Sequence, residues 1–171
     1  MAIIKNKEQR VGVFMDVQNM YHSAKNIYGA RVNFREILKT AVANRKLIRA
    51  IAYVVTTESG DEKAFLEALT KSGIEVKSKD LQIFPGGMKK ADWDVGMAVD
   101  TIKLSEKLDC VVLVTGDGDF VPLIQYLQAN GQQVEVIAFE KSSSNKLIEA
   151  ADDFIDLGKS PQKYLIGIRN K

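Results

Sequence analysis

Cysteine, histidine and tryptophan each occur only once in this chain of 171 residues. The single cysteine, Cys110, excludes a disulfide framework and a zinc site made of cysteines. It begins an apolar run, so we interpret it as a buried, inert thiol. The single histidine, His22, would have to serve any Ser-His-Asp triad alone, and the sequence contains no G-x-S-x-G nucleophile elbow. We therefore interpret His22 as a solvated or packed side chain and do not expect triad hydrolysis.

Long apolar runs and strong net charge are also missing. No apolar stretch reaches the roughly 18 residues of a membrane span, and the first residues are too short in apolar length for a signal peptide. We expect no membrane partner and a cytoplasmic location. The formal net charge of +2 does not by itself indicate a nucleic-acid binder. The chain length and a hydrophobic content of 46% predict one globular domain over residues 1–171.

Short apolar runs alternate with amphipathic segments along the chain. We expect strands at 11–15, 48–55, 74–78, 110–114 and 134–139, with further short strands at 81–84 and 154–157. Helices are expected from about Met20, after Asn33 (which begins a pattern similar to a capping box), after Ser59, and near Trp93, Phe120 and Ser144. Residues 85–90 are typical of a loop, and the tail over residues 158–171 has no clear pattern. This alternation predicts an α/β domain with a mostly parallel sheet.

Acidic residues follow two of the expected strands. Asp16 ends the first strand, while Asp117 and Asp119 follow the strand at 110–114. In a doubly wound parallel sheet these two strands are neighbours at the switch point where ligands bind. Because neighbouring carboxylates repel each other unless a cation or a raised pKa relieves them, the pattern suggests a metal site.

A third acid comes from the helix near Trp93. At 100° per residue, Asp94 falls on the same helix face as the apolar Met97, Ala98 and Ile102. It also lies in the first turn, where the helix dipole favours a carboxylate. Asp100 falls on a different face of the helix. We therefore expect Asp94 to join the metal site, although a solvated charge at the start of a helix is the alternative.

Other roles for the same residues stay open at this point. Asp119 is equally suited to capping the helix from Phe120, and Asn19 to capping the helix from Met20. Gly116 and Gly118 fit simple turn positions. Asp117 is harder to explain structurally, since an acid at a strand end beside another acid has no evident packing function.

Three segments resemble the motifs of NYN domains, which belong to the PIN-like nucleases, in their LabA-like bacterial subgroup. They are Phe14-Met-Asp16-Val-Gln-Asn19-Met, Lys90-Ala-Asp-Trp-Asp94-Val-Gly-Met-Ala-Val-Asp100 and Val114-Thr-Gly-Asp117-Gly-Asp119-Phe-Val-Pro-Leu123. The resemblance covers about residues 11–157. It implies a PIN-like, Rossmann-like three-layer α/β/α fold. The family's Lys-Gly-Val-Asp lead-in is one residue longer here, so its lysine corresponds to Lys89 or Lys90.

The resemblance implies a ribonuclease that uses Mg²⁺ or Mn²⁺. Its catalytic and metal-binding acids match Asp16, Asp94, Asp117 and Asp119, while Asn19 and Asp100 match accompanying positions. Oxygen ligands suit these ions, and the sequence offers almost no histidine or cysteine. From the chemistry of such a site, we expect Asn19 and Thr115 to donate hydrogen bonds to a phosphate or to position a carboxylate. The alternative is an RNA-binding or regulatory module that keeps the acidic cleft without efficient cleavage.

Basic residues must surround an acid cluster that receives a phosphodiester. Lys89 and Lys90 immediately precede the helix of Asp94, so we expect them to contact the RNA backbone, with Lys141 and Lys146 as the next candidates. The alternative is a solvated charged loop. We interpret Trp93 as a core residue in preference to a base-stacking one. The expected partner is single-stranded RNA, and a homodimer or a protein partner stays open. A dinucleotide-binding oxidoreductase is disfavoured, because no G-x-G-x-x-G follows the first strand.

Overall fold

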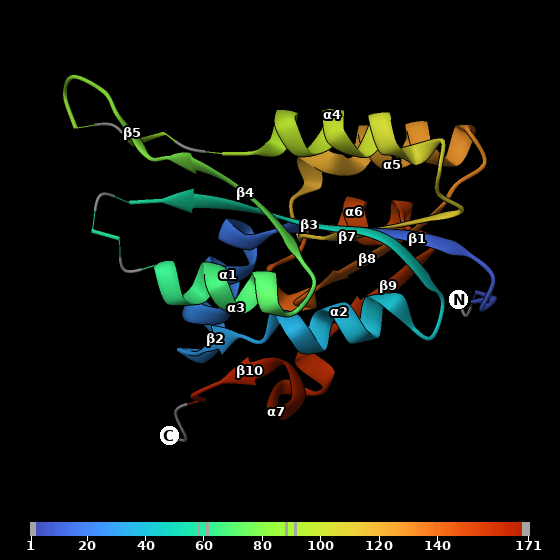
Figure 1. Ribbon diagram of the computed structural model, residues 1–171, viewed down its shortest axis with the longest axis horizontal. Coiled ribbons are helices and arrows are strands. Elements are labelled where there is room, and N and C mark those ends of the chain that lie inside the picture. The colour runs from blue at the N-terminus through green and yellow to red at the C-terminus, as the bar shows by residue number, and fades with distance from the viewer. Residues whose placement is uncertain (1–2, 58, 61, 88, 91, 169–171) are drawn as a thin grey trace.

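A six-stranded parallel sheet forms the centre of the molecule (Figure 1). The computed structural model describes residues 3–57, 59–60, 62–87, 89–90 and 92–168, and only the backbone of 82, 83, 89 and 90. Every strand pairing in this sheet is parallel, in the order β4-β3-β1-β7-β8-β9. The strands are β1 (Arg10–Asp16), β3 (Lys46–Thr56), β4 (Glu75–Asp80), β7 (Cys110–Val114), β8 (Gln133–Ala138) and β9 (Asp153–Asp156). This is the doubly wound order, and it makes β1 and β7 neighbours as the sequence predicted.

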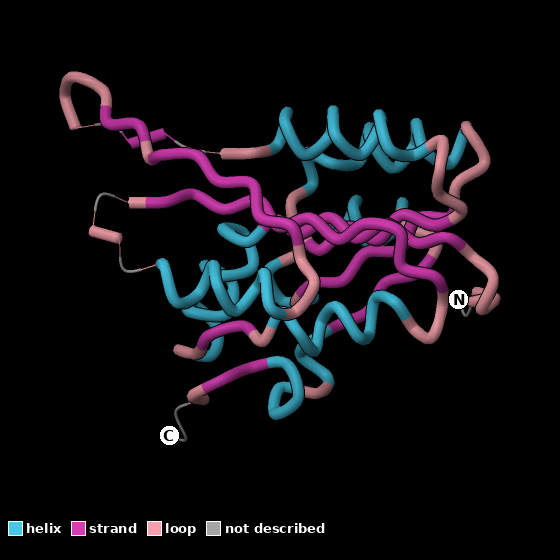
Figure 2. The backbone as a smooth tube through the Cα atoms, in the orientation of Figure 1, coloured by secondary structure: helices cyan, strands magenta, loops and turns pink. Residues whose placement is uncertain are grey.

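Helices cover both faces of the sheet, which gives the three expected layers (Figure 2). One layer holds α1 (Val17–Tyr28), α2 (Phe34–Val42) and α3 (Lys63–Lys71). The other holds α4 (Asp94–Ser105), α5 (Val121–Ala129) and α6 (Asn145–Ala150). Short 3-10 turns η1 (Gly118–Phe120), η2 (Glu140–Ser142) and η3 (Leu157–Lys159) connect these elements. Among the helices described, none combines the length and apolar character needed to cross a membrane.

Burial on both faces explains the continuous apolar runs of the central strands. Val13 and Met15 of β1 face the layer of α1 to α3, whereas Phe14 faces α4 and α5, and all three are fully buried. All five residues of β7 are buried. A strand buried on both faces cannot alternate apolar with polar residues. The same run therefore brings Asp16 and Thr115 to the edge where β1 and β7 end.

The C-terminal tail, which the sequence left ambiguous, packs on the layer of α2. It forms α7 (Pro161–Tyr164) and β10 (Leu165–Ile166), and β10 pairs antiparallel with β2 (Arg31–Val32). The Tyr164 hydroxyl lies 2.7 Å from Thr40 Oγ1 on α2, and Tyr164 and Leu165 are buried. These contacts attach the tail to the rest of the domain.

The segment expected to be a loop before α4 is partly a hairpin. Strand β5 (Gln82–Ile83) pairs antiparallel with β6 (Lys89–Lys90). Gly86 and Gly87 both have positive φ between the two strands, a conformation that glycine adopts without strain. The loop prediction was therefore right for the turn and wrong for residues 89–90.

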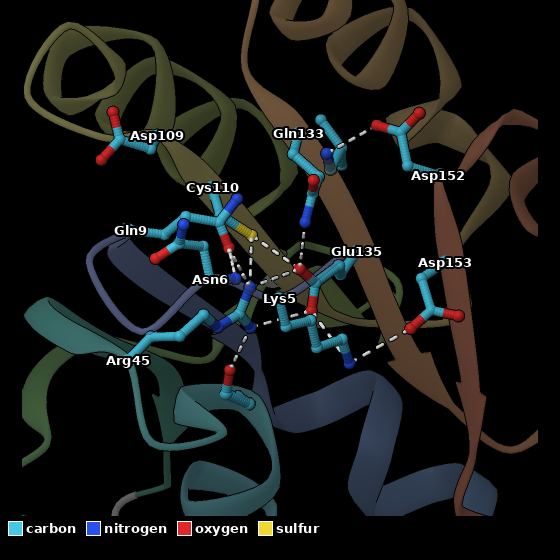
Figure 3. A network of polar contacts seen from close by, with 12 residues as sticks. Lys5, Asn6, Gln9, Arg45, Asp109, Cys110, Gln133, Glu135, Asp152 and Asp153 are labelled. Atoms are coloured by element: carbon cyan, nitrogen blue, oxygen red, sulfur yellow. Dashed lines mark hydrogen bonds and ion pairs between the residues drawn. The ribbon is translucent and has the colours of Figure 1, made fainter. Parts of the chain in front are cut away.

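A buried ion pair lies at the end of the sheet opposite Asp16 (Figure 3). Arg45 binds the Glu135 carboxylate through two nitrogens, at 2.7 and 3.0 Å, and both side chains are fully buried. The Cys110 thiol donates to Glu135 Oε2 at 2.9 Å. Burial, together with the nearby Glu135 charge, raises the pKa of Cys110, as expected for an inert thiol. Arg45 therefore has a structural role at this end of the sheet.

Candidate metal centre

Asp16 occupies the junction between β1 and α1 and has hydrogen-bond partners on both of its oxygens. Its Oδ1 accepts the backbone N–H of Asn19 at 3.3 Å, which makes Asp16 the N-cap of α1. Its Oδ2 accepts the Thr115 hydroxyl at 3.0 Å. The alternative in which Asn19 caps a helix from Met20 is excluded, because α1 begins at Val17 and Asp16 is its N-cap. Asp16 is only 9% exposed, and this burial raises its pKa against the effect of the two hydrogen bonds.

Asp117 lies just beyond β7, beside Asp16. Its Oδ1 accepts the backbone N–H of Asp119 at 2.9 Å, and its own N–H donates to Thr115 Oγ1 at 3.2 Å. The fully buried Thr115 hydroxyl thus contacts both strand ends. Asn19 adds a second link, because its Oδ1 accepts the backbone N–H of Gly116 at 2.9 Å. Thr115 and Asn19 therefore connect the two loops that carry Asp16 and Asp117.

Asp94 approaches from the first turn of α4. The preceding Trp93 sets the start of this helix, since its indole N–H donates to the Val54 carbonyl at 3.0 Å. Burial, followed by the charges of Asp117 and Asp16, raises the pKa of Asp94 to about 7. The helix-phase argument was right about Met97, which is fully buried, but Ile102 is 38% exposed. The buried face is narrower than predicted, and Asp94 lies half-buried at its edge.

The three carboxylates of Asp16, Asp94 and Asp117 converge. One oxygen from each lies within 4.8 Å of the other two. Such an arrangement concentrates negative charge, which adds to the effect of burial in raising the pKa of Asp94. The donor set consists only of carboxylate oxygens, which is the set that suits Mg²⁺ or Mn²⁺. The residues present therefore fit a hard divalent cation.

Asp119 stands apart from the three converging acids. It lies within η1 and is exposed, and in the part of the chain that the structure describes it does not join the group of three. Its predicted capping role was wrong, because Asp117 caps η1 and no side chain caps α5. A role for Asp119 as a metal ligand stays a prediction.

Asp100 also lies outside the group, further along α4. It accepts the Tyr53 hydroxyl at 2.9 Å and Lys77 Nζ at 2.7 Å. Burial opposes ionisation of Asp100, but these two hydrogen bonds hold its pKa below the ordinary value. Asp100 therefore fastens α4 to β3 and β4. Trp93 packs against the Tyr53 ring, and Lys79 Nζ lies over the Trp93 ring at 4.5 Å from its centre. These contacts fit the interpretation of Trp93 as a core residue.

Gly116 and Gly118 do more than form a turn. A Cβ added to Gly116 would lie 2.6 Å from Ser143 Oγ, and one added to Gly118 would lie 2.7 Å from Ser144 Oγ. The Ser144 N–H donates to the Gly116 carbonyl at 3.0 Å. The glycines thus allow the segment before α6 to pack directly against the loop that carries Asp117.

A cleft of about 310 Å³ opens in front of the three acids. Its wall includes Asp92 and Ser142, and a run of residues from α1 of which sequence reasoning assigned only Asn19 to the site. These are Gln18, Asn19, His22, Ser23, Asn26 and Ile27. His22 is exposed, as expected, but it faces this cleft. The helical spacing of polar residues after Asp16 was the signal that could have identified the wall.

The predicted RNA-binding lysines are not part of the described wall. The backbone of Lys89 and Lys90 forms β6, but their side chains lie outside the described part of the structure. Lys141 and Lys146 are exposed and do not line the cleft. Backbone contacts by these four lysines stay predictions.

Comparisons with known proteins agree with this geometry. A family model described as "NYN domain" matches residues 10–158. The Low amplitude and bright protein LabA of Synechococcus elongatus is 29% identical over 160 residues, which cover 88% of this chain and 85% of LabA. An uncharacterized protein of Methanocaldococcus jannaschii is 29% identical over 91% of this chain and 58% of its own length. The crystal structure of a protein of unknown function from Vibrio parahaemolyticus superposes with a TM-score of 0.85 at 27% identity, covering 96% of this chain and all of that one.

Proposed function

Because the chain belongs to the NYN domain family, within the PIN-like nuclease superfamily, we propose that it is an endoribonuclease that hydrolyses single-stranded RNA with Mg²⁺ or Mn²⁺. The observation that carries this proposal is the convergence of Asp16, Asp94 and Asp117 within 4.8 Å at the switch point of a doubly wound sheet. Asp16 and Asp117 also cap helical turns, but capping does not require three carboxylates to converge, and a shared cation would relieve their mutual repulsion.

The cation, when bound, supplies a water of lowered pKa and neutralises charge on the phosphodiester. The protein provides the geometry for this chemistry. Asp16 holds one orientation because Thr115 and the Asn19 N–H engage its two oxygens. Asp117 holds its orientation because the Asp119 N–H binds one of its oxygens. These contacts fix ligand oxygens before a cation arrives, which lowers the entropic cost of binding.

The central assay is cleavage of a fluorescent single-stranded RNA with Mn²⁺ or Mg²⁺, compared with the same reaction in EDTA. Asp16→Asn, Asp94→Asn and Asp117→Asn are expected to lower the rate by a factor of about 100 or more, since each removes an anionic ligand oxygen. Glu106→Gln is the matched control, because Glu106 is an exposed acid of the same helical segment, remote from the three acids.

The outcomes separate the two functions that the sequence suggested. Wild-type rates in all three Asp→Asn variants would refute the proposed mechanism. Tight binding of the RNA by wild-type protein without any metal-dependent cleavage would favour the non-catalytic RNA-binding module instead. A binding titration with the same fluorescent RNA reports whether the protein binds RNA at all.

A further inference from the structure

Apart from Ile27, the side chains that α1 contributes to the cleft wall are polar, and none of them is lysine, arginine, aspartate or glutamate. Asn19, His22, Ser23 and Asn26 follow the spacing i, i+3, i+4 and i+7, which places them on one helix face. The opposite face packs into the core through Val17, Met20 and Ala24. The stripe extends over seven helical steps from Asn19 to Asn26, a length of about 10 Å along the helix axis, and begins close to Asp16.

The fold makes little use of these polar groups. Within the described part of the chain, the side chains of His22, Ser23 and Asn26 form no hydrogen bond. Asn19 uses its carbonyl to accept the Gly116 N–H, which leaves its two amide N–H donors available. A helix face that only needed solvation would serve equally well with lysine and glutamate, which favour helices more than asparagine, serine and histidine do. The stripe instead offers donors and acceptors to whatever occupies the cleft.

The chemistry of the stripe indicates the kind of ligand. Phosphate groups are bound mainly by arginine and lysine, and the described cleft wall contains neither. Asparagine amides, a serine hydroxyl and an imidazole instead match the edges of unpaired bases and the ribose 2′-hydroxyl. An imidazole ring also offers a surface on which a base can stack. The volume of about 310 Å³ lies at the lower end of the range for small-ligand clefts.

We propose that one face of α1, formed by Asn19, His22, Ser23 and Asn26, is a nucleotide-binding subsite. Its side chains would contact the base and the 2′-hydroxyl of the nucleotide next to the scissile phosphate. The identity of the ligand as RNA rests on the proposed function. The acids then supply the reactive centre, while α1 supplies discrimination between bases and between RNA and DNA. His22 and Asn26 lie further along the stripe than Asn19, so they can contact a base without forming hydrogen bonds to the loops that carry the metal-binding acids.

Equilibrium binding tests this subsite separately from cleavage. Fluorescein-labelled ten-residue homopolymers of adenylate, cytidylate and uridylate, and the DNA oligomer matching the preferred RNA, are titrated by anisotropy in EDTA at constant salt. The wild type is expected to prefer one RNA homopolymer over the others and over its DNA counterpart. Asn26→Ala and His22→Ala should each weaken binding of the preferred RNA about 3- to 10-fold, the value of one or two lost hydrogen bonds, and reduce its preference over the other probes. Both residues are exposed, so the melting temperature should stay close to that of the wild type.

Gln125→Ala is the matched control, because Gln125 is an exposed amide on α5, outside the cleft wall. It should leave every affinity unchanged. The inference is overturned if the wild type shows no base or sugar preference or binds none of the probes. It is also overturned if Asn26→Ala and His22→Ala leave every affinity unchanged or weaken all probes equally.

The inference and the proposed function fail in different ways. A base preference that Asn26→Ala removes, in a protein that never cleaves RNA, supports the subsite and refutes the nuclease. Metal-dependent cleavage with unchanged binding preference in both variants supports the nuclease and refutes the subsite.

Discussion

Replacing Asp94 by asparagine should stabilise the metal-free protein at alkaline pH. The carboxyl has a pKa of about 7 in the fold, because of its burial and the charges of Asp117 and Asp16, against about 3.9 in an unfolded chain. Between these values the folded state retains a proton that the unfolded state has lost. Stability therefore falls as pH rises from about 4 through 7, and the penalty is complete above 7.

The size of this penalty follows from the shift. At 1.36 kcal/mol for each pKa unit, the full shift would correspond to about 4 kcal/mol. Asp94 is only half-buried, so screening by solvent reduces the expected value to about 1–2 kcal/mol. The substitution also loses about 0.3–1 kcal/mol of favourable interaction with the dipole of α4. The net gain for Asp94→Asn at pH 8.5 is about 1 kcal/mol, or roughly 2–4 °C in melting temperature for a protein of this size.

Thermal melts in EDTA at pH 5.5, 7 and 8.5 measure this gain directly. At pH 5.5, midway between the two pKa values, Asp94→Asn should melt above the wild type by about half as much as it does at pH 8.5. Addition of Mn²⁺ should reverse the order, since a cation at 100 times its dissociation constant stabilises the wild type by about 2.7 kcal/mol. Glu106→Gln is expected to follow the wild type in all conditions. A difference between Asp94→Asn and wild type that does not vary with pH, or equal stabilisation of both by Mn²⁺, would refute the reasoning.

Three other substitutions test the surroundings of the site and the opposite end of the sheet. Thr115→Val removes two buried hydrogen bonds and should cost about 1–3 kcal/mol of stability in denaturant melts, with a lower cleavage rate; a stable variant with normal cleavage would contradict this. Gly118→Ala should cost about 1–3 kcal/mol by overpacking, and Ser144→Gly in the same chain should recover part of it, because the added Cβ would lie 2.7 Å from Ser144 Oγ. Arg45→Met leaves the buried Glu135 with Lys5, at 3.4 Å, as its remaining cationic partner and should cost up to about 3–5 kcal/mol, whereas Arg45→Met combined with Glu135→Leu should cost less. Equal losses in the single and double variants at either pair would show that the named contact is not the cause.

Much of the fold was predictable because its signals are local. The apolar run before Asp16 and the one from Cys110 to Val114 marked buried strands, and their alternation with helices predicted the parallel sheet. Asn33 was correctly identified as the cap of α2, since its side chain accepts the Glu36 N–H at 3.3 Å. Capping of this kind depends on residues three positions apart, which a sequence displays directly.

Errors occurred where two local readings competed. Asp16 and Asn19 both suit the cap of α1, and the β1 strand end decided in favour of Asp16. The sequence reading gave Asp117 no structural function, yet Asp117 caps η1 by accepting the Asp119 N–H, whereas Asp119 caps neither η1 nor α5. Propensity ranks these residue types almost equally as caps, so only the path of the chain distinguishes them.

The sequence by itself determined which residues stand at strand ends, because burial on both faces of a parallel sheet requires unbroken apolar runs and leaves the acids at their ends. It thereby identified Asp16 and Asp117, and helix phase added Asp94. The tertiary structure alone decided that these three converge while Asp119 and Asp100 stand apart. It also decided that Thr115 contacts both strand ends and that α1 presents an uncharged wall to the cleft. The contacts of Thr115 join residues far apart in the chain, which no local periodicity indicates. The polar spacing along α1 marks one helix face, but only the fold shows that this face meets the cleft.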